Sequence, residues 1–258
     1  MNPTPQTPPV QGQTVHLMLT CLCDAFFPEV GIATVECLEH LGFRVAFLES
    51  QTCCGQPAFN SGDRKSARSV ARHCLKVFEK VDHLICPSGS CSAMIRWGYP
   101  QLFRDEVDAE QALGMGARTW ELSEFLTAVG PKPWPGRYPK KIAFHRSCHM
   151  RELSKEAGPE TILKSIAGLE LMTPQQSEQC CGFGGTFAVS FSDISTTIGS
   201  AKLQTLVDCE ADEWVTSDMG CLMHLEGYRR HQDHKVFRAT GTPFRHYVQV
   251  LRDCLATT

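Results

Sequence analysis

The chain has 258 residues, of which 42% are hydrophobic and 21% charged, with a formal net charge of −3. This length allows one or two domains with a real core, and the apolar content excludes a disordered chain. The slight acidic excess argues against a nucleic-acid binder, and no apolar run approaches the roughly 20 residues of a membrane span, so we do not expect an integral membrane protein.

The first fourteen residues are rich in Pro, Gln and Thr and lack hydrophobic periodicity, so residues 1–14 are predicted to form a disordered tail. Beyond them, short apolar runs typical of buried strands alternate with helical stretches. Strands are expected at Thr14–Thr20, Phe43–Leu48 and His83–Cys86, and helices at Gly31–Leu41 and Gly62–Lys80. This alternation predicts βαβ units and a parallel sheet, with binding loops at the carboxyl ends of the strands.

Residues 130–141 contain four prolines and are predicted to form a linker. The pattern then begins again. Strands are expected at Lys141–His145, Leu169–Met172, Glu213–Thr216 and Lys235–Ala239, and helices at Pro159–Ala167, Asp193–Cys209 and Pro243–Leu255. We therefore predict an α/β protein with two pseudo-repeated, Rossmann-like parallel-sheet domains, over residues 15–129 and 142–258.

The two halves carry the same cysteine pattern: a single cysteine, an adjacent pair followed by glycine, and a last cysteine. These residues are Cys21, Cys53, Cys54 and Cys91 in the first half, and Cys148, Cys180, Cys181 and Cys221 in the second. The first three recur after 127 residues and the last after 130. Such a match indicates an internal repeat. We expect each set to gather at one edge of its sheet, and the two sets to face each other near the linker.

The chain contains fourteen cysteines, but its N-terminus lacks the positive and apolar regions of a signal peptide. We therefore expect a cytoplasmic protein, in which many reduced thiols indicate metal or redox chemistry. Four thiolates suit a tetrahedral zinc ion or an iron–sulfur cluster. Adjacent cysteines form an awkward disulfide and are uncommon in zinc fingers, whereas neighbouring thiolates can reach different irons. The pattern favours one iron–sulfur cluster per half, with zinc or metal-free redox thiols as alternatives.

The other six cysteines are weaker candidates for metal ligands. Four are expected on helices without partners and fit a packed core: Cys37, Cys74, Cys209 and Cys254. Cys86 is expected in a strand, either as a core residue or as a further ligand beside Cys91. Cys23 competes with Cys21 for the ligand position, but the repeat favours Cys21, because Met150 stands at the place equivalent to Cys23.

Three histidines lie close to the cysteine motifs: His145, His149 and His224. Hydrogen bonding around the sites is the simplest role for them. His149, next to Cys148, is the candidate for proton transfer, because histidine exchanges protons near neutral pH. Arg146 and Arg151 flank the same cysteine and could stabilise thiolates or an anionic ligand, although a solvated surface would explain them equally well.

Two copies of the long-spaced Cys…Cys-Cys-Gly…Cys pattern resemble the CCG cysteine-rich domain iron–sulfur proteins. These include the cysteine-rich component of heterodisulfide reductase and iron–sulfur subunits of glycolate- and glycerol-3-phosphate-oxidising complexes. The local sequence is more similar still to the lactate utilisation protein A family, from about Val15 to Leu255. The segments that carry this resemblance are CCGQPAFNSG (53–62), PSGSC (87–91), SCHM (147–150), CCGFGGTF (180–187) and GCLMHLEG (220–227).

The resemblance implies an iron–sulfur electron-transfer subunit of a complex that oxidises L-lactate to pyruvate, with two [4Fe-4S] clusters on the eight repeated cysteines. It also implies a ferredoxin-type iron–sulfur subunit and a third small subunit as partners. Many CCG domains end in C-x-x-C, whereas this chain has Ser88 and Asp218 at the earlier position. That departure argues against a five-thiolate cluster and against disulfide reduction, and leaves Asp218 or Ser88 as a candidate oxygen ligand.

Two other functions stay open. One centre could bind glycolate or another small 2-hydroxy acid directly at an open iron, assisted by His149 or an adjacent arginine. Alternatively, the chain could be a zinc-binding scaffold subunit. Metal analysis after anaerobic purification distinguishes iron from zinc, and a spectral change on adding L-lactate would indicate direct substrate binding.

Overall fold

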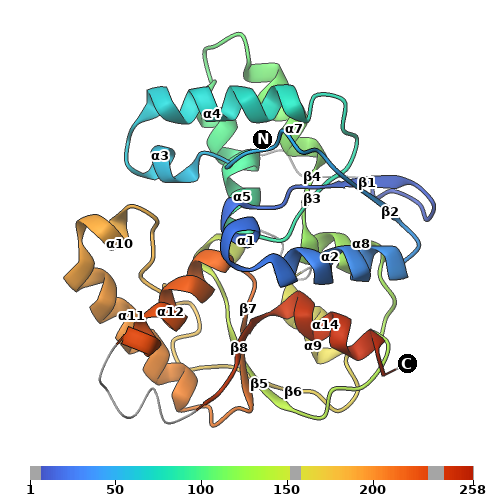
Figure 1. Cartoon of the computed structure of the whole chain (residues 1–258), viewed down its shortest axis with the longest axis vertical. Coiled ribbons are helices and arrows are strands. Elements are labelled where there is room, and N and C mark those ends of the chain that lie inside the picture. The colour runs from blue at the N-terminus through green and yellow to red at the C-terminus, as the bar shows by residue number, and fades with distance from the viewer. Residues whose placement is uncertain (1–6, 152–157, 232–240, 258) are drawn as a thin grey trace.

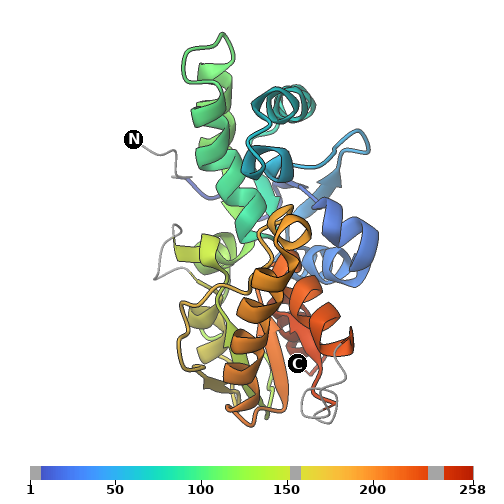
Figure 2. The same cartoon turned by 90° about the vertical axis from the view of Figure 1, so that its left-hand side faces the viewer.

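The computed structural model describes residues 7–151, 158–231 and 241–257. They form two halves that stack along the long axis of the molecule (Figures 1 and 2), each built on a four-stranded parallel sheet with flanking helices. The strand orders are β2-β1-β3-β4 and β6-β5-β7-β8, so the second sheet repeats the first. The predicted α/β class with two parallel-sheet repeats is thereby confirmed.

In the first half, helices connect short strands. The strands are β1 (Thr14–Leu17), β2 (Arg44–Phe47), β3 (Leu84–Cys86) and β4 (Thr119–Glu121). The helices are α1 (Cys21–Phe26), α2 (Pro28–His40), α3 (Gln56–Asn60), α4 (Arg64–Val77), α5 (Gly89–Ala93), α6 (Tyr99–Leu102), α7 (Ala109–Arg118) and α8 (Leu122–Val129). A π-helical turn, Met94–Gly98, joins α5 to α6.

The second half repeats this arrangement. Its strands are β5 (Lys141–His145), β6 (Glu170–Met172), β7 (Glu213–Thr216) and β8 (Phe244–His246). Its helices are α9 (Pro159–Lys164), α10 (Phe187–Ser190), α11 (Ser192–Val207), α12 (Met219–His231) and α14 (Tyr247–Leu255), with a 3₁₀ turn at Cys148–Arg151. Within the described ranges, no helix combines the length and apolar character needed to cross a bilayer.

Local sequence explains the regular elements. Helix α4 begins where the Asp63 side chain accepts a hydrogen bond from Ser66 N at 3.0 Å, as an N-cap does. Its buried residues recur at helical spacing and share a core cluster with Leu84 and Cys86 of β3: Ala67, Ala71, Cys74 and Leu75. In β7 all four residues are buried, which is typical of a parallel strand covered on both faces.

The last strand departs from the sequence-based expectation. The predicted strand Lys235–Ala239 lies outside the described residues, and the fourth strand is Phe244–His246, where a helix was predicted to begin at Pro243. That part of the prediction was wrong, because Phe244–His246 pairs with β7 as a strand instead of opening the helix. The helix begins at Tyr247, and the His246 side chain caps it by accepting a hydrogen bond from Val248 N at 3.4 Å.

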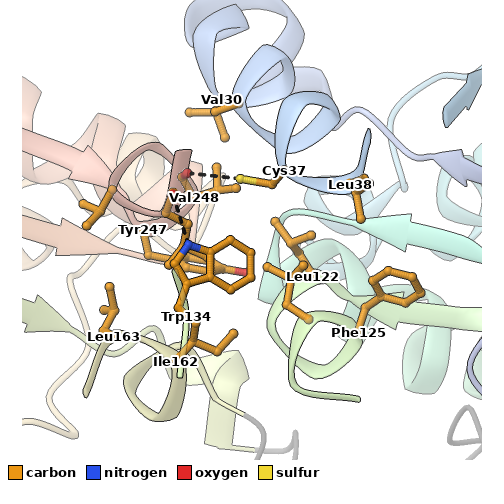
Figure 3. Close-up of a cluster of buried hydrophobic side chains, with 14 of the residues drawn as sticks. Val30, Cys37, Leu38, Leu122, Phe125, Trp134, Ile162, Leu163, Tyr247 and Val248 are labelled. Atoms are coloured by element: carbon orange, nitrogen blue, oxygen red, sulfur yellow. Dashed lines mark hydrogen bonds between the residues drawn. The ribbon is translucent and has the colours of Figure 1, made fainter. Parts of the chain in front are cut away.

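One continuous core joins the two halves. Figure 3 shows Leu122 and Phe125 of the first half in one buried cluster with Tyr247 and Val248 of the second. The linker contributes Trp134, which is buried and donates its indole N–H to the carbonyl of Leu251 at 3.1 Å. The halves are thus packed together as well as tethered. The boundaries 15–129 and 142–258 stay predictions.

The segment before β1 also contacts the first half. Gly12 N donates to the carbonyl of Gly42 at 2.8 Å, and the carbonyl of Gln13 accepts from Arg44 N at 3.1 Å. These bonds continue the pairing of β1 with β2 toward the N-terminus. The predicted tail, residues 1–14, lies partly outside the described residues.

Candidate metal centres

A cavity of about 170 Å³ lies between the two halves. All eight repeated cysteines line it: Cys21, Cys53, Cys54, Cys91, Cys148, Cys180, Cys181 and Cys221. The lining residues in the described ranges include none of the predicted linker, of which Trp134 and Tyr138 pack in the shared core. The carboxyl edges of both sheets therefore open onto one common cavity.

The same local architecture positions both cysteine sets. In the first half, Cys21 opens α1 directly after β1, the adjacent pair follows β2, and Cys91 lies in α5 after β3. In the second half, Cys148 follows β5, the pair follows β6, and Cys221 lies in α12 after β7. In each set the second cysteine of the pair and the last cysteine are buried, and the first two are more accessible.

The glycine after each cysteine pair has a specific geometric role. Gly55 has φ +84° and Gly182 has φ +91°, a left-handed conformation that side chains rarely adopt. This conformation aims the Gly55 amide at Cys53 Sγ, 3.4 Å away, and the Gly182 amide at Cys180 Sγ, 3.3 Å away. A Cβ at Gly182 would lie 2.5 Å from a backbone oxygen, so this position excludes other residues.

In each half the cysteine sulfurs lie in a row, each in contact with the next. Cys21 Sγ lies 3.6 Å from Cys53 Sγ, and Cys54 Sγ lies 3.4 Å from Cys91 Sγ. Cys53 also accepts a hydrogen bond from the Cys54 thiol, which links the two pairs. In the second half the contacts follow the same order: Cys148, Cys180, Cys181, Cys221.

Hydrogen bonds between these sulfurs favour the thiolate form of the accepting cysteine. The thiol of Cys21 donates to Cys53, and this hydrogen bond holds the pKa of Cys53 well below its ordinary value and raises the pKa of Cys21. The thiol of Cys148 does the same for Cys180. Metals bind the thiolate form of cysteine, and a thiol loses its proton when it binds a metal. Sets in which some cysteines are already thiolates are therefore suited to a metal or an iron–sulfur cluster.

The spacing of the sulfurs separates two kinds of metal site. One tetrahedral zinc ion with Zn–S bonds of about 2.3 Å would hold all four sulfurs about 3.8 Å apart. Across the described parts of the chain, the group whose ligand atoms all lie within 4.8 Å of one another is His145, Cys181 and Cys221, and no three cysteines meet this criterion. Neighbouring sulfurs of the first half lie 3.6 and 3.4 Å apart, near the zinc spacing, but no whole set is this compact. A cluster does not require such compactness, because its thiolates attach to different metal atoms.

Asp218 ties the two halves together beside the cavity. Its Oδ2 accepts hydrogen bonds from Ser88 Oγ and Ser90 N, each at 3.0 Å, and its Oδ1 accepts from Gly220 N at 2.9 Å. A carboxylate of the second half thus binds the start of α5, which carries Cys91. The sequence marks Asp218 as a replaced cysteine and a candidate oxygen ligand, whereas in the structure its oxygens accept hydrogen bonds from Ser88, Ser90 and Gly220.

His149 lines the cavity and contacts both halves. Its Nδ1 lies 3.6 Å from Cys148 Sγ, and its Nε2 lies 3.2 Å from Gln56 Nε2. The Gln56 amide also donates to the carbonyl of Ser90 at 3.1 Å, which assigns its nitrogen as the donor. His149 then accepts at Nε2 and carries its proton at Nδ1, toward the cysteine. Gln56 had no sequence signal beyond its place after the CCG motif.

The flanking arginines are engaged by carboxylates. Arg146 pairs with Glu160 at 3.6 Å, and Arg151 pairs with Glu178 at 2.8 Å. Neither arginine is among the residues that line the cavity. His224 stands outside the cavity lining too, with Nε2 3.3 Å from Ser195 Oγ, and burial lowers its pKa.

The two ambiguous cysteines occupy different places. Cys23 is fully buried, donates its thiol to the carbonyl of Phe27 at 3.4 Å, and does not line the cavity. Cys86 is fully buried at the end of β3 and donates to Cys91, which borders the cavity. The remaining cysteines are buried or half-buried away from the cavity: Cys37, Cys74, Cys209 and Cys254.

Comparison with known proteins gives a consistent set of similarities. The sequence model of the CCG cysteine-rich domain matches residues 15–96 and 142–226. Over 225 residues the chain is 40% identical to lactate utilization protein A 2 of Bacillus cereus (strain Q1), covering 86% of this chain and 93% of that protein. Lactate utilization protein A of Exiguobacterium sp. is 41% identical over 232 residues, covering 86% and 92%.

A solved structure has the same fold. The crystal structure of a hypothetical protein from Helicobacter pylori matches with a TM-score of 0.69 at 11% sequence identity. The match covers 100% of this chain but 52% of the other, so this chain spans about half the length of that protein. At this identity the likeness concerns the fold alone.

Proposed function

Since the chain belongs to the CCG cysteine-rich domain family and to the lactate utilization protein A family, we propose that it is an iron–sulfur subunit that transfers electrons in lactate utilisation. The observation that carries this proposal is the pair of matched thiol sets lining one cavity. In this proposal each half binds one [4Fe-4S] cluster, through Cys21, Cys53, Cys54 and Cys91, and through Cys148, Cys180, Cys181 and Cys221. The clusters would supply one-electron transfer.

The residues that line the cavity favour electron transfer over direct substrate binding. A 2-hydroxy acid carries a carboxylate, and a site for it usually offers an arginine or lysine. Of the described residues that line the cavity, none is a lysine or an arginine, and Asp218 adds a negative group. We therefore place lactate oxidation elsewhere in the complex and give this subunit the transfer of its electrons.

The electron balance agrees with two centres. Oxidation of L-lactate to pyruvate releases two electrons and two protons, and two one-electron centres in this chain can pass those electrons in turn. The proposed donor or acceptor partners are a ferredoxin-type iron–sulfur subunit and a third small subunit, in the cytoplasm. His149 is the proposed proton-holding residue, with its Nδ1 proton beside Cys148.

Anaerobic purification followed by iron, sulfide and zinc analysis tests the proposal directly, with EPR and Mössbauer spectroscopy to report the type and number of clusters. We expect iron and sulfide for two clusters and no spectral change when L-lactate is added to the isolated protein. Stoichiometric zinc without iron would instead indicate a scaffold. A cluster signal that changes with lactate would favour direct substrate binding.

A further inference from the structure

His145 is an unusual buried histidine. It is the last residue of β5, its side chain is fully buried, and both of its ring nitrogens lack a hydrogen-bond partner among the described residues. Burying a polar ring without a partner costs free energy, so such groups are rare unless something absent from the polypeptide satisfies them.

The surroundings of His145 indicate what satisfies it. A ring nitrogen of His145, Cys181 Sγ and Cys221 Sγ all lie within 4.8 Å of one another. Imidazole nitrogen and thiolate sulfur both bind zinc and iron, and some zinc and iron–sulfur sites combine them. The unpartnered ring is therefore placed against two of the proposed cluster ligands.

The internal repeat supplies a comparison at the same position. Met18 precedes His145 by 127 residues, the spacing that relates the cysteine sets, and it follows β1 as His145 ends β5. Met18 is fully buried in one apolar cluster with Cys54 and Cys91, the counterparts of Cys181 and Cys221. An apolar side chain thus fits this place, so the fold itself does not require a histidine there.

The charged groups that face His145 come from several elements. Lys202 of α11, Cys180, Asp218 and Arg151 act on it electrostatically, and Lys202 donates to the carbonyl of Gln176 at 3.2 Å. In a neutral imidazole one ring nitrogen carries no proton, and its lone pair can bind a metal.

We propose that His145 is a nitrogen ligand of the second centre, beside Cys181 and Cys221. The two centres would then differ chemically: the first has four thiolates alone, and in the second His145 would be a fifth protein donor, on an iron that already has a thiolate. This inference rests on the proposed function, because it assumes that an iron–sulfur cluster occupies the second thiol set.

The test uses the full chain, produced with ¹⁵N in the histidine rings, purified anaerobically and reduced, with iron analysis and electron–nuclear double resonance. We expect a strongly coupled ring nitrogen in the unsubstituted protein. His145→Met, which copies Met18, should lose this coupling, and His149→Gln should keep it. His145→Cys supplies a substitute ligand, so it should keep the iron and lose the coupling, even where His145→Met does not fold.

The outcomes separate the two ideas. Iron with no strongly coupled ring nitrogen, or a coupling that persists in His145→Cys, would overturn the histidine ligand and leave the proposed function standing. A weak nitrogen coupling with a solvent-exchangeable proton would also overturn it, since the ring would then donate a hydrogen bond. Absence of iron from the unsubstituted protein would contradict the proposed function itself.

Discussion

The two halves present the same thiols in different surroundings. Strand order, the CCG turn and the glycine amide on the first cysteine of the pair are alike in both. The neighbours of the thiols differ: Met18 in the first half corresponds to His145 in the second, and Ser88 to Asp218. The repeated fold therefore determines the positions of the cysteine thiols, while single substitutions around them determine the charge and polarity of each centre.

A second difference lies at the ends of the outer strands. Glu121 ends β4 and His246 ends β8, and each side chain caps the helix that follows it. Both are fully buried. Burial raises the pKa of Glu121 to about 8 and lowers the pKa of His246 to about 4. The same structural position is therefore filled by groups whose titration acts on stability in opposite directions.

Substituting the buried cysteine of each pair should give the largest effect. Cys54→Ser and Cys181→Ser should each remove one centre, because serine is a poor ligand for iron, and the double variant should bind none. Iron per protein after anaerobic purification measures this, with Cys209→Ser, which lies away from the cavity, as the control. Loss of all iron in either single variant would show one shared centre instead of two.

Glu121→Gln should change how stability depends on pH. Because the folded pKa of about 8 exceeds the ordinary 4.5, Glu121 favours folding most below pH 4.5, and this contribution is lost as pH rises toward 8. At about 1.4 kcal/mol per pKa unit, the loss amounts to a few kcal/mol at most. Denaturant unfolding across this pH range should show a flatter profile in the variant, and an unchanged slope would contradict the assignment.

His246→Gln should change the pH dependence of stability on the acidic side. The pKa of His246 falls from 6.5 to about 4 on folding, so its contribution is present above pH 6.5 and is lost as pH falls toward 4. The same unfolding series should show less acid destabilisation in this variant than in the unsubstituted protein, by roughly 1–3 kcal/mol near pH 4. If Glu121→Gln and His246→Gln flatten the same side of the profile, the comparison between the halves fails.

Asp218→Ala should weaken the contact between the halves. It leaves the amides of Ser90 and Gly220 without their acceptor, so we expect a loss of about 1–3 kcal/mol in the free energy of unfolding. Asp105→Ala, an exposed aspartate, should change stability by less than about 0.5 kcal/mol. Denaturant unfolding of both variants under anaerobic conditions checks this. Equal effects would show that the bridge does not stabilise the fold.

The regular pattern of the sequence predicted much of the fold. Strands β5 and β7 have the bounds that their apolar runs predict, Lys141–His145 and Glu213–Thr216. The pattern did not predict the outer strands β4 and β8, which form because they pair with the neighbouring strands β3 and β7. The sequence pattern likewise predicted no helix over Met219–His231, where α12 lies.

The sequence by itself determined the two matched thiol sets and the turn that holds each one, because these depend on residue types and short-range spacing. The repeat also predicted that the two sets face each other. Only the tertiary structure decided that they line one common cavity, that Asp218 reaches Ser88 and Ser90, and that the His145 ring has thiols beside it. Such contacts join residues far apart along the chain. They depend on how the two sheets meet, and the core that contains Leu122, Trp134 and Tyr247 sets that geometry.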